Sequence, residues 1–153
     1  YQQNGDQLIK IELSPVSHGE TSTGFGGKLW MNLPGATSSL KIAEPQPGFF
    51  ISTDRVWVYQ LRLSAFEVKR GKYPYRVAPV EKDLQHPESK VVAKLDFFTK
   101  SLDIQAGKAT ERVWLIRPKK PLKPGEYALA MSGDGPVADF TIIDTGAKSG
   151  KAK

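Results

Sequence analysis

The 153-residue chain contains no cysteine, which excludes several kinds of chemistry at once. It removes disulfide bonds, thiolate nucleophiles and cysteine-ligated zinc or iron–sulfur centres. Histidine is nearly as scarce, since His18 and His86 are the only two and no paired-histidine spacing exists. We therefore expect neither a bound metal nor another cofactor.

Long apolar runs are also missing, because no stretch approaches the about 18 consecutive apolar residues that span a membrane. Helical patterns are almost absent. One helical turn is predicted at Glu81–Gln85, and Pro87 ends it. The 14 glycines and 11 prolines instead separate short segments in which apolar and polar residues alternate, as half-buried β-strands do.

The clearest of these segments is Pro121–Leu129. Pro124-Gly125 predicts a type II turn, because proline presets the first central φ and glycine allows the positive φ at the second. A strand follows, and after Gly133–Pro136 a second strand, Val137–Ile143, completes a hairpin. We expect the core to be closed by aromatic and aliphatic side chains of this hairpin and of two further strands, namely Tyr127, Leu129, Phe140, Ile142, Trp57 and Trp114.

Similar patterns along the chain predict about nine to eleven short strands, the longest at Arg55–Leu63. The fold class is therefore all-β, a β-sandwich with a β-barrel as the alternative. We expect one domain over residues 7–144, a frayed N-terminus at 1–6 and a disordered basic tail at 145–153. The glycine-rich stretch Val16–Lys28 is expected to be a long exposed loop.

Catalytic motifs are weak. His18 lies near several serines and threonines of the Val16–Lys28 loop, but no nucleophile-elbow sequence is present. Gly24–Lys28 fails the P-loop pattern at both ends, since Ser22 and Leu29 stand where the pattern requires glycine and serine or threonine. A pair of carboxylates that hydrolyses glycosides cannot be recognised from one sequence. We expect no enzyme, with a carboxylate-based hydrolase left open.

A segment that mixes cations and tyrosines is the most specific functional candidate. Lys69–Arg76 carries four cations and two tyrosines in eight residues, a mixture typical of proteins that bind single-stranded nucleic acid. The alternative is an exposed hairpin whose charges keep it soluble and protect a strand edge. The candidate binding residues are Lys69, Arg70, Lys72, Tyr73, Tyr75 and Arg76, joined by a second basic group, Lys119, Lys120 and Lys123.

The net charge of +6 fits either interpretation. It favours acidic partners such as nucleic acid or acidic glycans. It also serves solubility, and Lys148, Lys151 and Lys153 contribute half of it from the tail.

Leu122–Leu129, followed by Gly133-Asp134-Gly135 and Asp139-Phe140, resembles the last hairpin of immunoglobulin-like β-sandwich modules of bacterial secreted and cell-envelope proteins. In those modules a Leu-x-Pro-Gly-x-Tyr-x-Leu segment often precedes the final strand. The resemblance covers about 25 residues of the chain and is specific for a strand and turn, not for an activity. It implies an immunoglobulin-like sandwich, an extracytoplasmic location and an accessory or binding role.

The leading hypothesis is a non-enzymatic binding or assembly module of a bacterial envelope or secreted system. Its partner would be a protein, contacted through edge strands or through the Val16–Lys28 loop, where His18 and Phe25 are the candidate contact residues. The alternative is a polyanion binder that uses the Lys69–Arg76 segment. Because the sequence begins at Tyr1, we expect either a processed mature protein or an excised domain, and the oligomeric state stays open.

Overall fold

The computed structural model describes residues 1–5, 7–23, 26–52, 61–83, 86–89, 95–106, 109–130 and 135–145. These residues form strands, turns and irregular segments and contain no helix, which confirms the all-β class. The strands are β1 (Gln2–Asn4), β2 (Gln7–Ile9), β3 (Ser17–Thr23), β4 (Gly26–Pro34), β5 (Lys41–Ile42), β6 (Phe49–Ser52), β7 (Arg62–Lys69), β8 (Tyr75–Asp83), β9 (His86–Ser89), β10 (Leu95–Ala106), β11 (Ala109–Pro118), β12 (Gly125–Ala130) and β13 (Ala138–Ile142).

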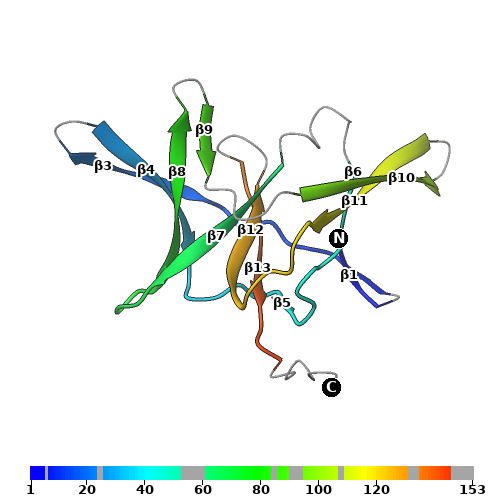
Figure 1. Ribbon diagram of the computed structural model, residues 1–153, viewed down its shortest axis with the longest axis horizontal. Coiled ribbons are helices and arrows are strands. Elements are labelled where there is room, and N and C mark those ends of the chain that lie inside the picture. The colour runs from blue at the N-terminus through cyan, green and yellow to red at the C-terminus, as the bar shows by residue number, and fades with distance from the viewer. Residues whose placement is uncertain are drawn as a thin grey trace, which may run out of the picture.

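The strands belong to two sheets. The first has the order β10-β11-β6-β1-β2 and the second the order β3-β4-β8-β7-β12-β13-β5, with β9 paired to β8. All pairs are antiparallel except β13 and β5, which run parallel. In Figure 1 the β3–β4 and β10–β11 hairpins extend to opposite sides, and β12 and β13 lie between them.

The main hydrophobic core lies between the two sheets, as expected of a β-sandwich. Phe49 of the first sheet meets Phe140 of the second, with ring centroids 5.0 Å apart. The ring of Tyr127 stacks on Phe140 at 5.7 Å. This core contains Ile42, Phe49, Leu61, Leu63, Ile116, Leu122, Tyr127, Leu129, Phe140 and Ile142, so all four residues predicted for the C-terminal hairpin are confirmed. Trp114 is buried as well, and Trp57 lies outside the described residues.

The opposite face of β12 is also buried, which explains why small residues alternate there with large ones. Ala128 and Ala130 pack in a second cluster with Met31, Leu33, Phe66, Ala78 and Val137. Val16 covers part of this cluster, and the nearby Ser14 forms an isolated antiparallel bridge with Val137. The segment that precedes β3 therefore crosses the face of the larger sheet that points away from the main core.

Two regions, one predicted as a loop and the other as a helical turn, contain strands instead. The expected Val16–Lys28 loop contains β3 and the start of β4, which pair from Ser17–Asn32 to Thr23–Gly26. The expected helical turn at residues 81–85 falls where β8 ends at Asp83 and β9 begins at His86, and the two strands pair as a hairpin. Antiparallel ladders satisfy the backbone of the described residues in both regions, and this outweighs their polar composition.

Both ends of the chain were expected to lie outside the domain. Gln2–Asn4, expected to fray, instead forms β1 and pairs with β2 and β6. The tail from 146 to 153 lies outside the described residues, as does most of the predicted strand at 55–63. No helix in the described part of the chain is long and apolar enough to cross a membrane.

The Pro124-Gly125 turn differs from its prediction. Gly125 has φ 159°, close to an extended conformation, whereas a type II turn requires about +80° there. Gly125 pairs with Ile142 and is the first residue of β12, so the ladder extends further toward the proline than expected.

Candidate functional site

The turn between β7 and β8 exposes most of the predicted basic and aromatic residues. Arg70, Lys72, Tyr73 and Tyr75 are exposed, and Tyr73 retains 79% of its accessible surface. The Lys72 ammonium lies 5.5 Å from the Tyr73 ring centroid, within cation–π range. Lys69 is half-buried and pairs with Glu67. The turn thus presents cations and ring faces together to solvent.

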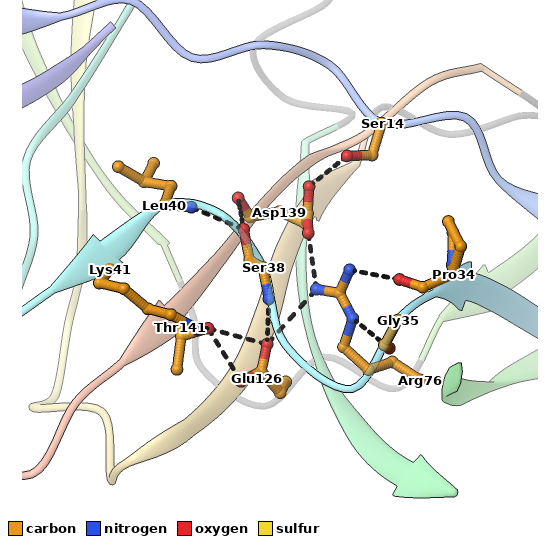
Figure 2. A network of polar contacts seen from close by, with 10 residues as sticks. All are labelled: Ser14, Pro34, Gly35, Ser38, Leu40, Lys41, Arg76, Glu126, Asp139 and Thr141. Carbon is orange, nitrogen blue, oxygen red and sulfur yellow. Dashed lines mark hydrogen bonds and ion pairs between the residues drawn. The ribbon is translucent and has the colours of Figure 1, made fainter. Parts of the chain in front are cut away.

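Arg76 is the exception in this segment, because it is buried with 3% of its surface exposed. Its Nη1 donates to Asp139 Oδ2 at 2.6 Å and lies 3.4 Å from Glu126 Oε2. Nε and Nη2 donate to the backbone carbonyls of Gly35 and Pro34 at 3.3 and 3.0 Å (Figure 2). Arg76 is therefore occupied inside the protein, and we leave it out of the surface that could meet a ligand.

Arg76, Glu126 and Asp139 form what we call the ionic cluster. The three residues come from β8, β12 and β13, on the face of the larger sheet that also carries the second hydrophobic cluster. Each is at most 6% exposed. Since a buried charge is costly unless it is paired and hydrogen-bonded, the surrounding donors decide whether this arrangement is stable.

Those donors are present for both carboxylates. Glu126 accepts from the Ser38 backbone N–H at 2.9 Å and from the Thr141 hydroxyl at 2.8 Å. The Thr141 hydroxyl in turn accepts from the Lys41 ammonium at 3.0 Å. Asp139 accepts from the Ser14 hydroxyl at 2.5 Å, and Figure 2 shows these side chains converging from separate parts of the chain.

The ionisation of Asp139 reflects this environment. Burial alone would raise the pKa of its carboxyl group. Hydrogen bonds from Ser14 and Arg76, the charge of Arg76 and a contribution from Ser38 outweigh burial and hold the pKa below its usual value. Asp139 is therefore a carboxylate at neutral pH, and the cluster holds one cation beside at least one anion.

The ionic cluster positions the base of the exposed turn rather than a substrate. Its charged groups are buried, and both carboxylates contact the same guanidinium, which suits structural pairing better than acid–base catalysis. The loop after β4 is held at two points, since Arg76 binds the Pro34 and Gly35 carbonyls and the Gly35 N–H donates to Pro74 O at 3.1 Å. Arg76 thus fixes the segment from which Tyr73 and Tyr75 project.

The second basic group, Lys119, Lys120 and Lys123, is exposed. Glu126 lies opposite Phe66, so the residues before β12 and the turn after β7 share one end of the larger sheet. His18 is an exposed residue of β3 at a register position opposite Met31, and Phe25 lies outside the described residues.

Sequence reasoning missed the partners of Arg76. Glu126 was visible as a charged residue on a strand face otherwise made of Ala128 and Ala130, and this was the one available signal of a buried charge. Ser14, Ser38 and Asp139 carried no signal, because such residues are ordinary in turns.

Comparison with known proteins adds no assignment. No family model matches the chain, and searches of curated proteins and of solved structures find no significant match. Within the described ranges, no group of three or more histidine and acidic side chains could hold a metal ion. The function must therefore be inferred from the surfaces of the fold.

Proposed function

We propose that the chain is a non-enzymatic, immunoglobulin-like binding module that contacts a protein partner through its strand edges and loops. A bacterial envelope or secreted assembly is the proposed setting, on the basis of the resemblance carried by Leu122–Leu129. The support comes from strand order, from one tyrosine contact and from an exposed edge.

Strand order supports the immunoglobulin-like part. Immunoglobulin sandwiches place strands A, B, E and D in one sheet and C, F and G in the other. When letters A to G are given in chain order to β1, β6, β7, β10, β11, β12 and β13, the first sheet becomes D-E-B-A with β2 added beyond A, and the second contains C-F-G. The other strands, namely β2, β3, β4, β5, β8 and β9, are then additions to this frame.

Tyr127 supports the same proposal. Its hydroxyl donates to the Lys123 carbonyl, four residues upstream, at 2.8 Å. Immunoglobulin-like domains have a corresponding tyrosine corner, in which a tyrosine near the start of strand F bonds to the backbone a few residues earlier. The Pro-Gly-x-Tyr segment that carries the resemblance thus has a structural purpose here.

The observation that carries the binding role is the exposed edge at β2. This strand ends the five-stranded sheet, and Leu8 in it retains 53% of its surface, with Leu13 exposed further along. An edge strand presents unpaired N–H and C=O groups that a partner strand can bind, and exposed leucines add apolar area to such a contact.

A photo-crosslinking amino acid at Leu8 would test this role in native envelope extract. We expect one discrete protein adduct, which competes with unlabelled chain and disappears when Leu13 is replaced by lysine. The same probe at Tyr73 is the control. An adduct at Tyr73 but not at Leu8 would contradict the edge, and hydrolysis of ester, glycoside or peptide panels at enzyme-like rates would contradict the non-enzymatic proposal.

Polyanion binding by the β7–β8 turn is the second candidate, and the exposed Lys72–Tyr73 pair favours it. It predicts retention on heparin or single-stranded DNA that weakens steeply with salt. Lys69→Glu with Arg70→Glu should abolish retention, whereas Lys10→Glu, an exposed change outside the turn, should reduce it little. Unchanged retention in the double variant would exclude this role.

A further inference from the structure

A cleft of about 700 Å³ lies between the β1–β2 turn and the free side of β5. This volume is within the range of about 300–1,000 Å³ typical of ligand sites. Its lining is mostly polar: Gln2, Gln3, Asn4 and Gly5 on one side, Lys41, Ile42, Ala43 and Glu44 on the other, with Gln46, Gly48, Arg117 and Ile143. Neither proposed binding surface includes it.

Arg117 is the incompletely satisfied group of this cleft. Its Nη2 donates to Gln3 Oε1 at 3.0 Å, which is its one side-chain hydrogen bond within the described ranges. Its Nε is buried and has no hydrogen-bond partner among the residues that the structure describes. Arg76 offers a direct contrast, since it contacts two carboxylates and two backbone carbonyls.

A half-buried arginine whose Nε lacks a hydrogen bond within the described residues is an energetically incomplete arrangement. Arginine binds carboxylates through two parallel hydrogen bonds, and such charge-assisted bonds are stronger than neutral ones. Lys41 and Glu44 also line the cleft, but the Lys41 ammonium donates to the Thr141 hydroxyl, so Arg117 is the cation of this lining with a buried donor left unpaired within the described residues. The chemistry of the cleft thus favours a carboxylate.

Gly48 keeps the cleft open beside this arginine. A Cβ at Gly48 would lie 3.2 Å from Arg117 Nε and 3.1 Å from Gln3 Oε1, closer than most real contacts. A side chain there would therefore push both groups out of their present positions.

The other wall of the cleft is a strand edge. The carbonyls of Leu40 and Ile42 accept from the N–H groups of Thr141 and Ile143 at 2.8 and 3.0 Å. Because backbone groups alternate in direction along a strand, the N–H and C=O of Lys41 point away from β13. β5 is the last strand of its sheet, and Lys41 and Ala43 both line the cleft.

We propose that the cleft binds an extended peptide, which adds to the free edge of β5 and places a carboxylate against Arg117. The edge supplies backbone hydrogen bonds and the arginine supplies specificity for the charge. This inference rests on the proposed role in protein binding, and it names a second contact surface and the chemistry that this surface recognises.

The test uses N-acetylated tetrapeptides, randomised at the first three positions, with a free C-terminal carboxylate or a C-terminal amide. Backbone amide shifts of Lys41, Ala43 and Gln3 report binding in an NMR titration. We expect saturable shifts with the free-acid pool and at least tenfold weaker binding of the amide pool. Arg117→Gln should also weaken binding at least tenfold, Arg117→Lys less, and the charge-matched control Lys10→Gln, outside the cleft, not at all.

Three results would overturn the proposal: no shift with the free-acid pool up to millimolar concentration, equal binding of both pools, or acetate binding as tightly as the peptides. Thermal melts of each variant identify a loss of peptide binding that comes from unfolding. In that case Gly48→Ala is a second substitution that perturbs the site. If the peptides fail while the Leu8 probe still gives its adduct, the cleft proposal falls and the binding role stands.

Discussion

Arg76 shows at the scale of one residue how a cation can be mistaken for a surface group. It stands between exposed Tyr75 and buried Val77 in a sequence that reads as basic and aromatic. The carboxylates that neutralise it lie 50 and 63 residues further along the chain. Local alternation cannot reveal such partners, because only the packing of β8, β12 and β13 brings them together.

Replacing Arg76 tests the stabilising role of the ionic cluster. Arg76→Met leaves the Glu126 and Asp139 carboxylates buried without their cation, and removal of one partner from a buried pair costs about 3–5 kcal/mol. Arg76→Lys keeps the charge but loses the fork that binds Pro34 and Gly35, so its loss should be smaller. Urea unfolding measures both.

The matched control for this prediction is Arg70→Met, which removes an exposed cation from the neighbouring turn. Its midpoint should be that of the wild type, since exposed charges contribute little. Equal midpoints for Arg76→Met and Arg70→Met would show that the buried pairing adds no stability. Should Arg76→Met not fold at all, Arg76→Lys still provides a measurable ranking.

Asp139 predicts the pH dependence of stability. The pKa of its carboxyl group is lower in the folded protein than the usual value of 3.8, so its contribution to the free energy of unfolding is fully present above about pH 4. The contribution is then lost as the pH falls through the folded pKa. Urea midpoints at pH 7, 5, 4 and 3 should decline in the acid range for the wild type and less for Asp139→Asn. Parallel curves for the two proteins would contradict the assignment of this slope to Asp139.

At the scale of elements, two Pro-Gly pairs adopt different backbone conformations. Gly35, which follows Pro34, has φ 77°, a conformation that other residues rarely adopt. Pro124-Gly125 has the same two residues but extends into β12. The difference is tertiary, since Gly125 finds a ladder partner in Ile142 whereas the Gly35 N–H bonds to Pro74.

Gly35→Ala tests whether this turn anchors the exposed β7–β8 turn. A Cβ at positive φ costs on the order of 1–2 kcal/mol, and it would strain the residue that both bonds Pro74 and accepts from Arg76. Faster hydrogen exchange at Gly35 and Arg76 and a lower urea midpoint should follow. Gly71→Ala is the control, since its Cβ would meet nothing within 4 Å. A control as destabilising as Gly35→Ala would exclude this explanation.

At the scale of the whole molecule, the sequence predicted the all-β class better than it predicted the extent of the two sheets. Alternation and aromatic positions identified the all-β class and the core residues of the last hairpin, because burial between sheets leaves a pattern in the strands themselves. β1, β3 and the glycine-rich start of β4 were missed. These segments are polar or rich in glycine, and the long-range pairing of β4 with β8 and of β1 with β6 stabilises them, which no local pattern records.

The two sheets meet through the core, and the Phe49–Phe140 pair is its aromatic contact across the sandwich. Both side chains are at most 1% exposed, so each phenylalanine-to-alanine change should cost about 3–5 kcal/mol. Phe49→Leu and Phe140→Leu, with their double variant, form a gentler thermodynamic cycle that removes the ring pair but keeps most of the volume. We expect a coupling of about 0.5–1.5 kcal/mol from urea unfolding, because aromatic pairs contribute this much beyond burial. A coupling of zero would mean that the two rings contribute independently. The contact between the sheets would then be stabilised by the burial of apolar surface and not by the ring pair.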